Sequence, residues 1–151
     1  MPGEFETTIT VGENSYIDID GANEYFENRL HAERWSGADS ETKEKALRQA
    51  TKEIDRQPIR GRKTDISQSL AFPRYPDTEA PEVVKEACCE EALALLERGN
   101  SQRRKLQQEG VQSFSLGNMS ETYITGAGKG LLSQEAKELL RPWLIGAVHI
   151  T

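Results

Sequence analysis

The stretch DIDG, residues 18–21, has the acidic side chains that a calcium-binding loop uses. An EF-hand loop that begins at Asp18 would need a glycine where Asn23 stands and a bidentate glutamate where Arg29 stands. Neither position fits, so we expect no calcium site. Asp18 is instead expected to cap the first turn of a helix, in which the helix dipole stabilises Asp20.

The stretch GAGKG, residues 126–130, has the composition of a phosphate-binding loop. That loop requires a glycine at the position where Tyr123 stands. It also requires a serine or threonine directly after Lys129, where the chain has Gly130. A flexible hinge between two elements is therefore the favoured interpretation.

No side chains have the spacing of a catalytic or zinc-binding set. His31 and Glu33 are two residues apart, so on a helix they point to different sides. Cys88 and Cys89 are adjacent, so on a helix they diverge by about 100° and by themselves form neither a relaxed disulfide nor a zinc site. We expect no catalytic residue, no metal ligand and no cofactor, and we expect that the protein is not an enzyme.

The strongest basic cluster is RGRK, residues 60–63, in an irregular segment. Two interpretations stay open for Arg60, Arg62 and Lys63. They either pair with acidic side chains of the same surface, or they contact DNA phosphates or an acidic neighbouring subunit. The stretch FPRYP, residues 72–76, adds aromatic rings nearby. Base stacking is one use for such rings, and packing of the loop on its own rings is the more common one.

The net charge limits these interpretations. The chain of 151 residues has 25 acidic and 19 basic side chains and a formal net charge of −6. A general polyanion binder gains affinity from basic side chains that displace counterions, so the overall charge argues against that class but leaves room for a local basic patch. No apolar run approaches the length of a membrane span, and we expect a soluble protein of one domain with no membrane partner.

Hydrophobic periodicity predicts the helices that position these residues. The first begins at the Asp18 cap, has one apolar face and ends near Trp35. The second covers residues 39–56, is capped by Asp39 or Ser40, and is stopped by the proline that follows.

Two further helices are predicted in the second half of the chain. One covers residues 81–98 and has a single buried stripe, with Glu90 and Glu91 at the edge of that stripe. The last begins after Ser133, which caps it, and kinks or ends at Pro142.

The other segments are expected to be non-helical. Residues 1–14 are predicted to form a flexible N-terminal arm, and residues 57–79 a long irregular loop. A period of two over residues 111–125 predicts a β-hairpin. The expected fold class is mainly α: a small bundle of about four helices within residues 15–145, with the inserted hairpin and with extended terminal arms that end in a C-terminal docking tail, residues 146–151.

The hairpin and the C-terminal end carry more apolar surface than a small bundle is expected to bury. One interpretation packs both against the chain's own core. The favoured one places them at an interface with another protein, because exposed apolar surface usually marks an interface. The side chains expected at this interface are Phe114, Leu116, Met119, Tyr123, Trp143, Leu144, Ile145, Val148 and Ile150.

A series of segments, taken in order, resembles a known family. The segments are SYIDIDGANEYFENRL, Trp35, ETKEKALRQATKEID, RGRK, LAFPR, PEVVKEACCEEALALL, GVQSFSLGNMSETY and LLSQEAKELLRPWL. In this order they resemble small tailed-phage proteins that are often labelled DnaT-like ssDNA-binding proteins. These are similar to the head-completion proteins, or head–tail connector adaptors, that sit beneath the portal. The resemblance covers nearly the whole chain from Ser15 onward.

The resemblance implies a structural role without catalytic residues. It implies a homo-oligomeric ring, usually of twelve copies, that contacts the portal protein and a downstream neck or tail component. Double-stranded DNA would pass through the ring without sequence-specific binding. The ring would be assembled in the bacterial host cytoplasm and located in the neck of the virion. The alternative function is that of a DnaT-like single-stranded DNA-binding protein, which the acidic net charge does little to support.

Overall fold

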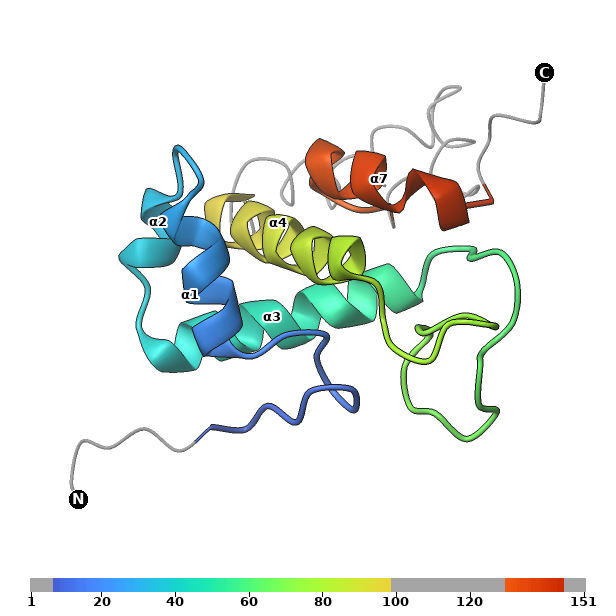
Figure 1. Ribbon diagram of the computed structural model, residues 1–151. Helices are drawn as coiled ribbons and strands as arrows, with labels where there is room; N and C mark the ends of the chain where they lie inside the picture. Colours follow the sequence, from blue (N-terminus) through green and yellow to red (C-terminus); the bar gives the residue numbers. More distant parts are fainter. Residues whose placement is uncertain (1–6, 99–129, 146–151) are drawn as a thin grey trace, which may run out of the picture.

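The computed structural model describes residues 7–98 and 130–145, which form a mainly α fold (Figure 1). The elements are α1 (Ile19–Glu27), α2 (Glu33–Ser36), α3 (Ser40–Asp55), α4 (Glu82–Arg98), α7 (Gln134–Leu140) and the 3-10 helix η3 (Arg141–Trp143). The predicted helical class is therefore confirmed. The predicted hairpin at 111–125 and the tail at 146–151 lie outside the described residues.

The first predicted helix is two helices, α1 and α2, with a tight turn between them. Arg29 holds this turn: its guanidinium donates to both carboxylate oxygens of Glu90, at 2.8 and 2.9 Å, and to the carbonyl oxygen of Leu30. His31, the residue before the N-cap of α2, has a φ of 61°, in the left-handed region that non-glycine residues seldom adopt. The turn brings the indole of Trp35 back onto Phe26, with 4.8 Å between the ring centroids.

The boundaries of α3 follow from its capping residues. The Asp39 carboxylate accepts a hydrogen bond from the Thr42 N–H at 2.8 Å, and the helix ends at Asp55, as predicted to within one residue. Leu47, Ala50 and Ile54 are fully buried on the face of α3 that packs against α4.

The helix α4 is the centre of the bundle. It packs between α3 and α7, with α1 and α2 beside its other flank (Figure 1). The expectation that Glu90 and Glu91 lie at the edge of one buried stripe is wrong, since their exposed fractions are 3% and 0%. The reason is that α4 is covered on several sides, whereas a stripe with an edge assumes one exposed face.

The carboxylate of Glu91 fixes the start of α7. It accepts the backbone N–H of Leu132 at 3.0 Å and that of Ser133 at 2.9 Å. Burial, together with the neighbouring carboxylate of Glu53, raises the pKa of Glu91 to about 7. The hydroxyl of Ser133 then caps α7 by accepting from the Ala136 N–H at 2.9 Å.

The long segment after α3 is irregular, as predicted, but it is closely held by its own side chains. The guanidinium of Arg74 donates to backbone carbonyls, and so does the amide of Gln68; the acceptors are Ile59, Arg60, Gly61 and Ala71 for the first and Leu70, Ala71 and Pro73 for the second. Phe72 anchors the segment to the bundle by edge-on contacts with Tyr16 and Trp143. Side-chain hydrogen bonds and the Phe72 contacts therefore hold this loop in one conformation, although it has no regular secondary structure.

Within residues 7–98 and 130–145, no helix combines the length and the apolar character that crossing a bilayer requires.

Candidate nucleic-acid interface

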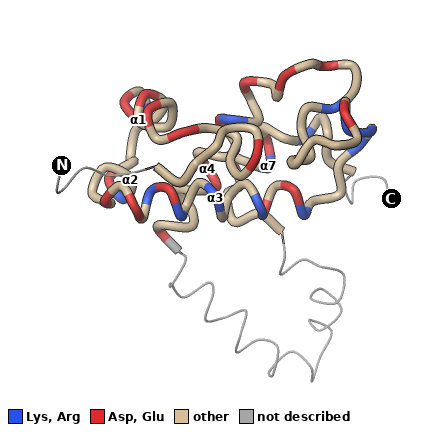
Figure 2. The backbone as a smooth tube through the Cα atoms, turned by 90° about the horizontal axis from the view of Figure 1, so that it is seen from below, with Lys and Arg blue, Asp and Glu red and all other residues tan. Residues whose placement is uncertain are grey.

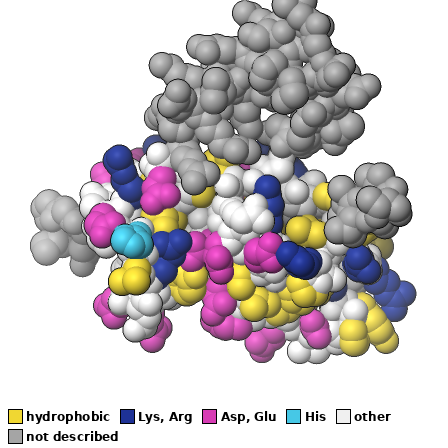
Figure 3. Space-filling view, turned by 90° about the horizontal axis from the view of Figure 1, so that it is seen from above, with side chains coloured by type: hydrophobic (Ala, Val, Ile, Leu, Met, Phe, Trp, Pro, Cys, Tyr) yellow, Lys and Arg dark blue, Asp and Glu magenta, His cyan; other side chains and the backbone are white. Residues whose placement is uncertain are grey.

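The basic residues singled out in the sequence lie together on the exposed loop that follows α3. Arg60, Arg62 and Lys63 are all exposed, and basic side chains gather at this end of the molecule (Figure 3). The guanidinium carbon of Arg62 lies 4.3 Å from the ring centroid of Tyr75, in a cation–π contact. The Nζ of Lys63 donates to the carbonyl oxygen of Gln68 at 3.2 Å.

Backbone pairing explains why Arg62 and Tyr75 face each other. The Tyr75 N–H donates to the Arg62 carbonyl at 2.8 Å, and the backbones of Lys63 and Arg74 form an isolated antiparallel β-bridge. The two rings of the aromatic stretch therefore differ in their exposure, and base stacking on either of them stays a prediction. Phe72, with 3% of its surface exposed, packs the loop on the core, whereas Tyr75 remains 55% exposed.

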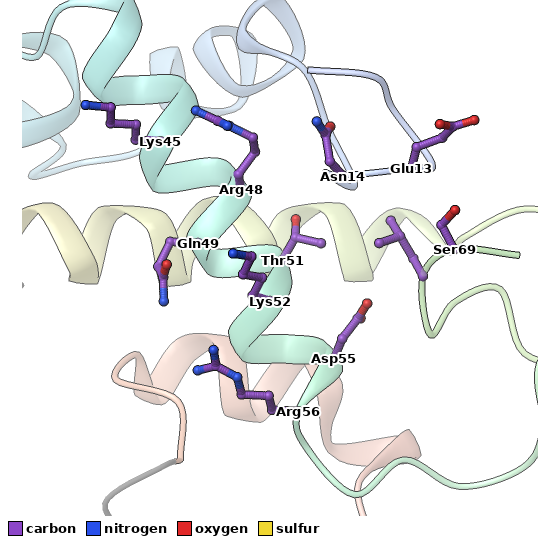
Figure 4. A pocket seen from close by; sticks show the side chains of 11 residues that line it. Glu13, Asn14, Lys45, Arg48, Gln49, Thr51, Lys52, Asp55, Arg56 and Ser69 are labelled. Atoms are coloured by element: carbon purple, nitrogen blue, oxygen red, sulfur yellow. The ribbon is translucent and has the colours of Figure 1, made fainter. Parts of the chain in front are cut away.

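The structure reveals a second basic surface that the sequence analysis missed. Lys45, Arg48, Lys52 and Arg56 form a row along α3 (Figure 4), and basic residues recur along this helix in Figure 2. The bases are separated by acidic, apolar and uncharged polar residues, so they form no basic run in the sequence. Their spacing of three, four and four residues was the available signal, because residues at that spacing share one helix face.

The row of bases borders a hollow of about 810 Å³. The N-terminal arm contributes Glu13 and Asn14 to its lining, and the loop contributes Ser69 and Leu70 (Figure 4). The hollow therefore brings together three segments of the chain: the arm, α3 and the loop.

A buried carboxylate fixes the arm to α3. Glu44 accepts the Thr8 N–H at 2.7 Å, the Thr8 hydroxyl at 2.8 Å and the Thr7 hydroxyl. Burial alone would raise the pKa of Glu44, but these hydrogen bonds hold it below its usual value. Residues 7–14 of the predicted arm are thus attached to the bundle, and residues 12–14 form a turn in which the Gly12 N–H donates to the Ser15 carbonyl at 2.8 Å.

A second carboxylate fixes the loop at the other end of the hollow. Asp55 accepts the Tyr16 hydroxyl and the Ala71 N–H, the latter at 3.2 Å. Burial raises the pKa of Asp55. Its acceptor oxygens are thus used by the protein's own donors.

The residues predicted to contact a partner protein are only partly described. Trp143 and Leu144 are half-buried against the protein's own core, and Ile145 is 46% exposed. The chain here pairs with the start of the basic loop, since the Arg60 N–H donates to the Trp143 carbonyl at 2.7 Å. The other predicted contacts lie outside the described residues: Phe114, Leu116, Met119, Tyr123, Val148 and Ile150. Contact of any of these side chains with a partner stays a prediction.

The groups considered for catalysis or metal binding are not brought together. In the described ranges, no three His, Cys, Asp or Glu side chains are placed to hold a metal ion. Burial raises the pKa of the Cys88 thiol to about 11 and also raises that of Cys89. Both thiols are therefore poor nucleophiles at neutral pH.

Comparison with known proteins gives one family. A family model described as "Putative DnaT-like ssDNA binding protein" matches residues 5–150. No curated protein and no solved structure gives a significant match. The match spans nearly the whole sequence, including the bundle, the basic loop and the row of bases on α3. The chain belongs to this family of DnaT-like proteins.

Proposed function

We propose that the protein binds single-stranded DNA and that the loop with Arg60, Arg62 and Lys63 makes contact with it. The observation that carries this proposal is the exposed ring of Tyr75 beside the Arg62 guanidinium. Sites for single strands combine positive charge along the backbone with aromatic rings on which bases stack. The family description names the same class of ligand.

The acidic net charge is compatible with this function because the charges are separated along the molecule. Residues 18–33 contain five acidic side chains and one basic one, and residues 56–79 contain five basic side chains and three acidic ones. The first set lies around α1 and α2, and the second lies on the loop at the opposite end of the bundle (Figure 1). Residues 18–33 thus carry a net charge of −4, whereas residues 56–79, which include Tyr75, keep a net charge of +2.

A salt titration with a fluorescent oligothymidine tests the proposal. The affinity should fall as salt rises, by about 0.7 in log K per unit of log salt for each phosphate contacted. Tyr75→Ala should weaken binding by about 1–3 kcal/mol, the worth of one stacked base, and Tyr75→Phe should retain most of the affinity. Ile66→Ala is the matched control, because Ile66 is 93% exposed in the same loop. Absence of binding at low salt would refute the function.

The second candidate function is that of the head–tail connector in a tailed phage, a ring that contacts the portal. The observation that favours it is the position of Ile145, which is 46% exposed just before the apolar tail. Trp143 and Leu144 pack against the core, so Ile145, the last described residue, has a fixed position. A docking segment needs such an anchor.

Truncation after Ile145 separates the two functions. The shortened protein keeps the Trp143 contacts and should remain folded, so loss of co-sedimentation with portal particles would support the connector. Retention of portal attachment would remove the tail from that model. If the full-length protein does not attach to portal particles but binds oligothymidine with a steep salt dependence, DNA binding remains as the function.

A further inference from the structure

The row of bases on α3 is largely free to meet an external anion. Lys52 and Arg56 are exposed and make no hydrogen bond or ion pair with any described side chain. Lys45 has a surface pair with Glu41 at 3.7 Å, which contributes little, and its charge also acts on the exposed Asp39. Arg48 uses one donor, its Nε, on the Glu44 carbonyl at 3.4 Å.

The acidic residues of α3 that could neutralise this row have other partners. Glu44 holds the arm and Asp55 holds the loop. Glu53 accepts the amide of Gln49 at 3.0 Å and lies beside the buried Glu91. Glu44 also lies near enough to Arg48 for the two charges to interact, but it is buried and its oxygens serve the arm. The exposed face of α3 thus presents four bases to solvent, and their combined charge would attract an anion.

The hollow beside the row is already formed. Its arm wall is attached through Glu44 and its loop wall through Asp55, so little ordering is needed when a ligand enters. Glu13 is the exposed acid on the opposite wall, and it limits the positive field there. The anion is therefore expected to contact the α3 side.

The shape of the row indicates an extended anion. Lys45 and Arg56 are separated by eleven residues, or about 16 Å along the helix. A single phosphate ion would meet only one or two of the four bases, whereas a nucleic-acid backbone presents successive phosphates along the row. The loop adjoins the Arg56 end of the row, since the Ala71 N–H donates to the carboxylate of the neighbouring Asp55 at 3.2 Å.

We propose that the α3 side of the hollow is a second nucleic-acid site, where Lys45, Arg48, Lys52 and Arg56 bind the phosphate backbone of a single strand whose bases reach Tyr75. This site extends the proposed function and rests on it. The loop supplies stacking, and α3 supplies contacts with phosphates.

The test is a salt titration of the full chain with an oligothymidine of about 16 nucleotides, the upper size of a typical single-strand site. The Lys52→Gln/Arg56→Gln variant should bind about tenfold more weakly and lower the salt slope by about 1.4, or 0.7 for each lost phosphate contact. Lys52→Arg should keep the wild-type slope because it keeps the charge.

The matched control is Arg34→Gln/Lys137→Gln, which removes the same charge from α2 and α7. This control should keep the wild-type slope, and a thermal melt of each variant verifies the fold. If Lys52→Gln/Arg56→Gln matches the control while Arg60→Gln/Arg62→Gln loses binding, the α3 site is refuted and the proposed function stands. If the wild-type protein binds no oligothymidine, both are refuted.

Discussion

Ionisation of Glu91 should make the folded protein less stable as pH rises. Its carboxyl has a pKa of about 7 in the folded protein against an ordinary value of 4.5, a difference worth about 3 kcal/mol. Because the folded-state pKa is raised, the stabilising contribution is full below pH 4.5 and is lost as pH rises through 7. The free energy of unfolding should therefore fall by up to about 3 kcal/mol between pH 5 and pH 8.

The substitution Glu91→Gln removes this titration but keeps the size of the side chain. Its amide must direct an NH₂ group at one of the two N–H donors of Leu132 and Ser133, so one hydrogen bond is lost. At pH 5 the variant should be less stable than wild type by about 1–3 kcal/mol. By pH 8 that deficit should shrink or reverse, because only the wild-type protein has lost the stability that depends on the proton.

Urea unfolding at each pH unit from 5 to 8 measures both curves. Glu97→Gln, an exposed position on the same helix, is the control and should follow the wild-type curve. If the wild-type and Glu91→Gln curves run parallel over this range, the carboxyl carries no extra proton and the reasoning is refuted.

Three further predictions concern the arm, the hollow and the loop. Glu44→Gln should release the arm, seen as faster proteolysis before Tyr16 with an unchanged bundle; unchanged cleavage would contradict the attachment. Glu13→Gln should raise oligothymidine affinity about twofold, because it removes a like charge from the wall of the hollow; a fall in affinity would contradict the α3 site. Arg74→Lys should lower the free energy of unfolding by about 1–3 kcal/mol, because an ammonium cannot reach the same carbonyls, and chemical denaturation measures this. Arg34→Lys, on the surface of α2, is its control and should leave that free energy unchanged.

Helix boundaries were predictable because they depend on nearby residues. Asp39 and Ser133 cap α3 and α7 through N–H groups three residues away, and such caps can be recognised in the sequence. The break between α1 and α2 was not predictable in this way. Its main contact joins Arg29 to Glu90, which are 61 residues apart.

The candidate site was predictable in part for a similar reason. Arg60, Arg62 and Lys63 are a run in the sequence, so they were found at once, and the structure places them on an exposed loop. The row on α3 could have been found only by comparing residues three and four positions apart, which share one face of a helix, rather than consecutive residues. The burial of Phe72 and the exposure of Tyr75 depend on backbone pairing across the loop, and no local sequence pattern indicates this pairing.

The position of the two cysteines offers a natural probe of unfolding. Cys88 and Cys89 are the only cysteines in the chain, and both are fully buried in α4. An alkylating reagent can reach them only when the central helix separates from its neighbours, so the rate of labelling would report on that opening without an engineered tag. The same arrangement leaves the rest of the chain free of thiols, and a single cysteine introduced at the surface could carry a dye or a crosslinker with little background.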